Sequence, residues 1–283
     1  MRSLLVPVEL CEGTAAQLAT ALLAAKRFGA HVDGLAPRLA ASAFALADGM
    51  GGGSVAVLEQ FDQEESDRAE RARQAFRDFM AEHEVLWGDP LKPSRQASAD
   101  WLSDVEPGDE AVGQRARLYD ATLLPRPVEG QGRPRASLLE TTLFESGRPV
   151  LVTPPVAPER LGASVLVAWN GSTESARSLR LAEPFLAAAE RVVVLAVEGG
   201  SVPGPSAGEV VAALRRAGIK AEAAAVRPEG QTIGAAILSE AGRLNADLLV
   251  KGAYTQSRLR QMILGGATSH ILKEAELPVL MAH

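Results

Sequence analysis

The chain has 283 residues, of which 29 are basic and 35 acidic, and 47% are hydrophobic while only 4% are aromatic. This length favours two domains, each large enough to bury its own core, and a core of Ala, Leu and Val is common in α/β proteins. A net charge of −6 with no long run of Lys or Arg argues against nucleic acid as the main partner.

The expected compartment is the cytoplasm. The single cysteine, Cys11, excludes an intramolecular disulfide and is typical of a reducing compartment. Residues 1–9 contain too few apolar side chains for a signal peptide, and no small-residue cleavage site follows them. No stretch approaches the roughly 20 apolar residues that a membrane helix needs. We therefore expect a cytoplasmic protein with no membrane partner.

The first half begins with an apolar strand within residues 3–9. Residues 39–54, which include Gly51, Gly52 and Gly53, predict a mobile loop, and residues 58–86 predict a long charged helix. One stripe of this helix is apolar and is expected to face the core, with a partner-binding groove as the alternative. The stripe consists of Phe61, Ala69, Ala72, Phe76, Phe79 and Met80.

The chain contains an internal duplication. Residues 3–9 resemble residues 164–170, and Arg148–Val152 resembles Leu277–Met281. Three prolines within residues 153–160 exclude a helix or a central strand there. We therefore place the two domains at 1–157 and 158–283.

Strands and helices alternate in the second half. The segment Gly171-Ser172 is a turn followed by a helix N-cap, which predicts a helix to about residue 189. The other predicted elements are strands at 164–169, 192–197, 219–226, 247–251 and 278–282, and helices at 208–217 and 232–244. This alternation predicts a five-stranded parallel sheet with helices on both faces.

Glycines flank the loop between the predicted strand 247–251 and the helical segment 267–275. Gly252 follows the apolar run 247–251, and Gly265-Gly266 precede the helical segment 267–275. Glycines at a strand end and at a helix start let backbone amides approach an anion without an intervening Cβ. The pattern therefore predicts a phosphate-binding loop.

The two halves resemble tandem universal stress protein domains, most clearly over 164–283. The first half is similar at its ends and over 139–152. The resemblance implies a Rossmann-like fold of the adenine nucleotide alpha hydrolase type, with a five-stranded parallel sheet between helices in each domain. Many members of this family bind ATP.

The family motif is Gly, a second Gly three residues on, nine residues, and then Gly followed by Ser or Thr. The corresponding positions are Gly252, Thr255, Gly265 and Gly266, so the second and fourth depart from the family type. Asn170 stands where many members have a carboxylate. The resemblance implies ATP or AMP as ligand, with or without Mg²⁺. The implied contact residues are Ala168, Trp169, Asn170, Gly171, Ser172, Val197, Gly252, Thr255, Arg258, Gly265, Gly266, Ala267 and Thr268.

Several of these residues have a simpler explanation. The glycines also fit turn and packing geometry inherited without a ligand, and Ser172 fits a helix N-cap. Arg258 and Arg260 either neutralise phosphate or are solvated helix residues. Lys251, at the strand end, either does the same or extends its ammonium to solvent.

The first half lacks this pattern. Pro125 occupies the position of Gly252, Ala136-Ser137 replace Gly265-Gly266, and the intervening loop is shorter by two residues. Pro125 has no N–H to donate. We expect no nucleotide in the first domain in the manner of the family.

Three functions remain open, because no catalytic motif is present. The first is a stress-response regulator that binds an adenine nucleotide without strong catalysis. The second is an interaction protein that has lost the nucleotide. The third is a slow ATPase using Glu174 and Asn170.

The resemblance also implies that strands 149–152 and 278–282 pair with each other or across subunits, giving an intramolecular pseudo-dimer with further homodimerisation as an option.

Overall fold

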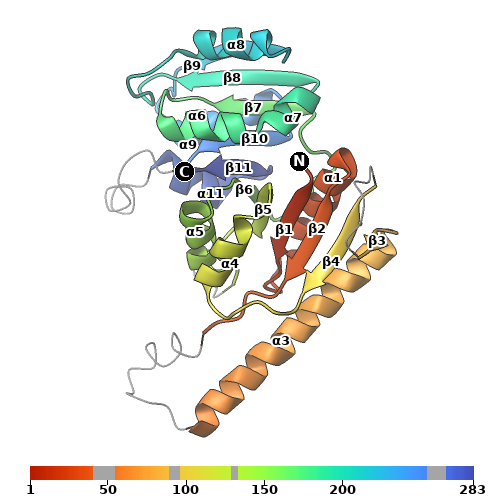
Figure 1. Cartoon of the computed structure of the whole chain (residues 1–283). Helices are drawn as coiled ribbons and strands as arrows, with labels where there is room; N and C mark the ends of the chain where they lie inside the picture. Colours follow the sequence, from red (N-terminus) through yellow and green to blue (C-terminus); the bar gives the residue numbers. More distant parts are fainter. Residues whose placement is uncertain (41–54, 89–95, 129–132, 254–265) are drawn as a thin grey trace.

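The computed structural model describes residues 1–40, 55–88, 96–128, 133–253 and 266–283. Its strands form one eleven-stranded sheet in the order β3-β4-β2-β1-β5-β6-β11-β10-β7-β8-β9. Figure 1 shows the strands of the two halves of the chain meeting near the centre of the molecule. The architecture is the expected α/β fold, with a mostly parallel sheet between helices.

The first half supplies one side of this sheet. Its elements are β1 (Ser3–Pro7), α1 (Thr14–Phe28), β2 (His31–Leu35), α3 (Val55–Glu82), β3 (Leu86–Trp87), β4 (Ser98–Leu102), α4 (Asp109–Ala116), β5 (Ala121–Pro125), α5 (Ala136–Glu145) and β6 (Val150–Thr153).

The second half supplies the other side. Its elements are β7 (Ser164–Ala168), α6 (Thr173–Leu181), α7 (Glu183–Ala188), β8 (Arg191–Val197), α8 (Ala207–Arg216), β9 (Ala221–Val226), α9 (Ile233–Arg243), β10 (Leu248–Gly252), α11 (Ala267–Glu274) and β11 (Val279–Ala282).

The two halves join through their last strands. β6 and β11 pair antiparallel, with Val152 opposite Val279 and Val150 opposite Met281, whereas every other pairing between described strands is parallel. This confirms the expectation that the terminal strands pair with each other. The pairing covers two edges that would otherwise expose unpaired backbone groups.

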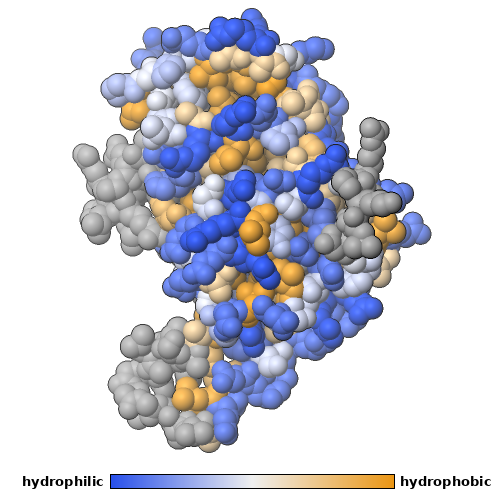
Figure 2. Space-filling model, in the orientation of Figure 1, coloured by the Kyte–Doolittle hydropathy of each residue, from blue (hydrophilic) through white to orange (hydrophobic). Residues whose placement is uncertain are grey.

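Helices cover both faces of the sheet. The buried side chains of one core come from α1, α3, α7 and α8, and those of the other come from α4, α5, α9 and α11. On the first of these faces, Figure 2 shows apolar side chains gathered beside α8. They belong to an apolar groove of about 320 Å³ lined by Leu179, Leu186, Val210, Leu214 and Ile219.

The long helix α3 begins and ends earlier than expected. It ends at Glu82, and Leu86–Trp87 form the short strand β3 beside β4. Glu84 adopts a left-handed backbone conformation, with φ of 54°, which a helix interior does not accept. The first half therefore has six described strands rather than five.

The apolar stripe of α3 faces the core near its carboxyl end. Ala72, Phe76 and Met80 are buried, and the ring of Phe76 lies 5.5 Å from that of Trp101. Towards its amino end, α3 extends away from the sheet (Figure 1). The glycines 51–53 and most of the predicted loop 39–54 lie outside the described residues.

One predicted helix of the second half is two helices. The segment expected to run unbroken to about residue 189 is divided into α6 and α7. Pro184 stands in the first turn of α7, where its missing N–H costs nothing, and Ala182 belongs to neither helix.

Candidate functional site

A crevice lies at the carboxyl ends of β7, β8 and β10 and encloses about 60 Å³. β7 lies between β8, the next strand in the chain, and β10, a later strand. The chain therefore builds the sheet first to one side of β7 and then to the other, so the direction of winding reverses here. Open α/β sheets bind their ligands at this kind of position. The crevice is lined by Ala168, Trp169, Asn170, Leu195, Val197, Gly200, Ile233, Ile237, Lys251, Gly252 and Ala267.

The segment after β8 folds over one wall of the crevice. The indole N–H of Trp169 donates to the Pro205 carbonyl at 2.7 Å, and the Val202 N–H donates to the Asn170 carbonyl at 2.8 Å. Gly171 has φ of 85°, and a Cβ there would lie 2.8 Å from the Val202 carbonyl oxygen. The close contact of the two segments explains this glycine without a ligand.

Asn170 and Ser172 organise the start of α6. The side-chain oxygen of Asn170 accepts from the Ser172 N–H at 3.1 Å, and the Ser172 hydroxyl accepts from the Ser175 N–H at 3.2 Å. Ser172 is therefore the N-cap of α6, as the sequence predicts. Ser172 and Gly171 support the crevice from behind and do not line it.

Gly252 lines the crevice but is also required by packing. A Cβ at this position would lie 2.5 Å from the backbone nitrogen of Ser175, in the first turn of α6. Any larger residue would force β10 and α6 apart. The close packing of strand and helix accounts for the glycine whether or not a ligand is present.

Lys251 forms the polar floor of the crevice. Its Nζ donates to the Gly252 carbonyl at 2.6 Å and to the Thr268 hydroxyl at 2.7 Å. Burial lowers the pKa of Lys251 to about 8. Thr268 lies in the first turn of α11, whose N-cap, Gly266, has no side chain to accept from the helix amides. The floor therefore combines an ammonium group with a helix N-terminus.

The structure brings together only part of the predicted site. Ala168, Trp169, Asn170, Val197, Gly252 and Ala267 line the crevice, and Gly266 and Thr268 adjoin it through α11. Thr255, Arg258, Arg260 and Gly265 lie outside the described residues.

Sequence reasoning missed four lining residues. Leu195 lies in the predicted strand 192–197, Ile233 and Ile237 lie in the predicted helix 232–244, and Gly200 follows the strand, but none of them belongs to a motif. Lys251 was a candidate because a lone charge ends an otherwise apolar strand. Its side chain is buried in the crevice and does not extend to solvent.

The equivalent corner of the first half is filled by its own side chains. Glu9 follows β1 as Asn170 follows β7, and it is 2% exposed. Its carboxylate accepts from the Arg135 N–H at the start of α5 at 2.9 Å and lies 2.9 Å from the Arg135 guanidinium. Arg133 lies 3.3 Å from the same carboxylate and 3.0 Å from that of Glu65. An internal carboxylate thus occupies the helix N-terminus where the second half has its crevice.

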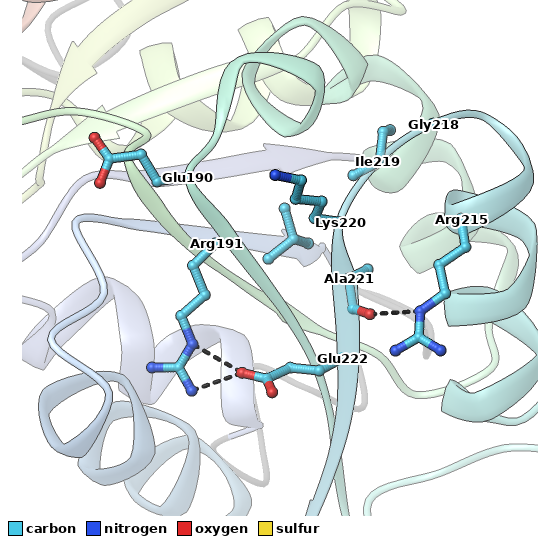
Figure 3. A pocket seen from close by; sticks show the side chains of 9 residues that line it. Glu190, Arg191, Arg215, Gly218, Ile219, Lys220, Ala221 and Glu222 are labelled. Carbon is cyan, nitrogen blue, oxygen red and sulfur yellow. Dashed lines mark hydrogen bonds and ion pairs between the residues drawn. The ribbon is translucent and has the colours of Figure 1, made fainter.

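A larger hollow, of about 600 Å³, opens at the opposite end of β8 and β9. Figure 3 shows that two of its cations are already engaged, because Arg191 pairs with Glu222 at 2.6 Å and Arg215 donates to the Ala221 carbonyl at 2.9 Å. This hollow lies at the amino ends of the strands, away from the winding reversal, and we do not assign the ligand to it.

The described part of the chain shows neither a metal site nor a membrane-spanning helix. No group of three or more His, Cys, Asp or Glu side chains is arranged to hold a metal ion. None of the described helices combines the length and apolar character that crossing a bilayer requires.

The universal stress protein family model matches residues 163–283. This match covers the strands and helices that build the crevice. Residues 163–283 are a universal stress protein domain. The match does not extend to the first half, so the tandem arrangement remains a prediction.

Solved structures show the same fold over the whole chain. A universal stress protein from Archaeoglobus fulgidus is similar with a TM-score of 0.72 and 18% identity, covering 99% of this chain and 95% of that one. A putative universal stress protein from Pseudomonas aeruginosa has a TM-score of 0.50 and 17% identity, covering 100% and 93%. A protein of unknown function from the same species has a TM-score of 0.52 and 16% identity, covering 100% and 92%. No curated protein matches the chain.

Proposed function

We propose that the chain is a stress-response regulator of the universal stress protein type that binds an adenine nucleotide, ATP or AMP, in the crevice of its second half. The supporting observation is the crevice itself, with apolar walls and a cationic floor at the winding reversal. Leu195, Val197 and Ile237 offer the apolar surface that a purine base requires. The amides of α11 and the ammonium of Lys251 are suited to phosphate.

The size of the crevice limits how the nucleotide enters. Its volume of about 60 Å³ is well below the roughly 300 Å³ at which small-molecule pockets begin. Binding therefore requires the crevice to widen, and we expect the segment Val202–Pro205, which is hydrogen-bonded to Trp169 and Asn170, to move away from them. The energy of ordering and displacing this segment reduces the affinity, so we expect binding in the micromolar to millimolar range rather than tighter.

The proposal includes no strong catalysis. A slow ATPase needs a group that orients water, and the nearest carboxylate considered for this role is that of Glu174. It accepts instead from the Thr173 hydroxyl at 2.8 Å. Since the described residues form no carboxylate cluster, any Mg²⁺ would arrive with the nucleotide.

The direct test is equilibrium dialysis with ATP, ADP and AMP at up to millimolar ligand. Retention of any one of them supports the proposal. If none of the three is retained, the proposal is rejected in favour of an interaction protein without nucleotide.

A matched pair of variants then locates the site. Ala267 and Ala207 are each the first residue of a helix and each partly buried, but only Ala267 lines the crevice. Ala267→Leu is expected to abolish retention because its side chain fills the crevice. Ala207→Leu is expected to leave it unchanged, and equal loss in both variants would place the nucleotide elsewhere.

A further inference from the structure

A lysine is buried at the end of β10, in a strand that is otherwise apolar. Lys251 is only 9% exposed, and its neighbours on the same side of the strand, Leu249 and Ala253, belong to the core beneath α9 and α11. A buried ammonium loses its hydration and is expensive unless an anion compensates it. The position therefore needs a physical explanation.

The described residues provide no compensating anion. No carboxylate among them lies within ion-pair distance of Lys251, and burial alone accounts for its altered pKa. The adjoining segment 254–265 contains no Asp or Glu in its sequence, although it contains Arg258 and Arg260. The positive charge is therefore not balanced from within this corner.

The surroundings of the ammonium add to the positive potential. Its two acceptors, the Gly252 carbonyl and the Thr268 hydroxyl, are both neutral, and its third N–H has no acceptor among the described residues. Thr268 belongs to the first turn of α11, which carries the positive end of the helix dipole. Two positive features thus converge on the floor of one crevice, and only an anion satisfies both.

We infer that Lys251 is the residue by which this crevice selects anionic ligands. It holds a phosphate group between its ammonium and the first turn of α11, while the apolar walls contact the remainder of the ligand. The inference rests on the proposed function for the identity of that ligand, an adenine nucleotide, and adds that the nucleoside without phosphate binds poorly.

Binding should also be linked to proton uptake. At pH 7 the ammonium is mostly protonated, since its pKa is about 8 in the unliganded protein. A bound phosphate raises this pKa, so above pH 8 the ligand binds together with a proton and its affinity falls.

Other groups near the corner do not explain such a dependence. The carboxylates on the packed elements are Glu174 on α6, Glu240 on α9 and Glu274 on α11, and none forms an ion pair with Lys251. The other titratable or charged residues on these elements and at the end of β11 are Arg177, Arg180, Arg243, His270, Lys273 and His283. His283 is bound to the Ala253 carbonyl at 3.1 Å. The phosphate itself titrates near pH 6, below the window.

The test compares AMP, adenosine and inorganic pyrophosphate by isothermal titration at pH 7 and pH 9.5. The proteins are the wild type, Lys251→Met, Lys251→Gln and the control Lys220→Met, which removes an exposed lysine far from the crevice. For wild type and the control, we expect AMP to bind at least about tenfold more tightly than adenosine at pH 7, and this preference to fall about tenfold by pH 9.5. Lys251→Met and Lys251→Gln should bind the two ligands alike at both pH values.

The outcomes separate this inference from the proposed function. If wild type binds AMP and adenosine equally, or if Lys251→Met keeps the preference, the inference is overturned while nucleotide binding stands. If pyrophosphate binds in a Lys251-dependent manner but neither adenine compound does, the inference stands and the proposed function fails. If none of the three ligands binds, both are rejected. Lys251→Gln, which keeps donors for the Gly252 carbonyl, guards against a loss caused by altered packing.

Discussion

Asp120 and Asp247 hold the same position in the two halves of the molecule. The carboxylate of Asp247 accepts from the N–H groups of Ala163 and Ser164, at 3.1 and 3.0 Å, just where β7 begins. The carboxylate of Asp120 accepts in the same way from Arg2 and Ser3 at the start of β1. Each aspartate also donates its own N–H to the serine carbonyl, at 3.0 and 2.9 Å. The duplication seen in the sequence therefore extends to individual hydrogen bonds.

Removing either carboxylate should destabilise the protein. Asp247→Ala leaves two backbone N–H groups without their acceptor, which costs about 1–3 kcal/mol in the free energy of unfolding. Asp120→Ala should cost a similar amount, because Asp120 also accepts from two backbone N–H groups, those of Arg2 and Ser3. Urea unfolding measures both, with Asp62→Ala on the exposed face of α3 as the control. A loss at only one of the two positions would contradict the equivalence.

The ion pair between Glu9 and Arg135 is buried, so removing Arg135 alone should destabilise the protein more than changing both residues. The side chains of Glu9 and Arg135 are 1% and 9% exposed. Arg135→Ala leaves the Glu9 carboxylate buried beside Arg133 alone, and we expect it to cost about 3–5 kcal/mol at pH 7. Adding Glu9→Gln to Arg135→Ala should recover part of this loss, because the charge that lacked a partner is gone. Additive losses in the double variant would exclude the coupling.

The raised pKa of Glu9 predicts how the free energy of unfolding changes with pH. Burial raises the pKa of the Glu9 carboxyl, although Arg135 and Arg133 oppose the shift. A carboxyl with a raised pKa in the folded state stabilises the protein most below its ordinary pKa, and that contribution falls as the pH rises through the folded value. The difference in unfolding free energy between wild type and Glu9→Gln should therefore grow in favour of Glu9→Gln between pH 4.5 and 7. Urea titrations at several pH values measure it, and a difference of the opposite sign would show that the arginines dominate.

Much of the fold could be predicted because its strands are buried on both faces. Such strands are continuous apolar runs, as in residues 192–197, and their order follows from the alternation with helices. Strand β3 could not be found this way, since its two residues, Leu86 and Trp87, are both exposed. The contact of Glu9 with Arg135 joins residues 126 positions apart, and no local pattern reveals a partner at that distance. The glycine motif predicted a site at the corner where the structure has its crevice, while Lys251, the buried charge in that corner, carried only the signal of a polar end to an apolar strand.

The continuous sheet predicts that the two halves unfold together. Leu280 on β11 is fully buried and pairs with Leu151 on β6, so Leu280→Ala leaves a cavity at the junction and should cost about 2–5 kcal/mol. Fluorescence from Trp101 in the first half and from Trp169 in the second can be followed separately in single-tryptophan variants. We expect both probes to report one transition in the wild type and the same shift in Leu280→Ala. Two separate transitions would show that the halves are stable independently of the β6–β11 pairing.

Lys251 should make the protein less stable at neutral pH than at alkaline pH. Its pKa is about 8 in the folded protein and 10.5 ordinarily, so between these values the unfolded chain binds more protons than the folded one. The free energy of unfolding then rises with pH over this window, by about 3 kcal/mol in total for this group. Lys251→Met removes the charge while keeping an unbranched side chain of similar length, and it should raise the stability at pH 7 and abolish that slope. The measurement is urea unfolding at pH 7, 8, 9 and 10 for wild type, Lys251→Met and Lys220→Met. A phosphate ligand supplies the missing anion and should flatten the wild-type slope in the same way, whereas an unchanged slope in Lys251→Met would show that the lysine is already compensated within the protein.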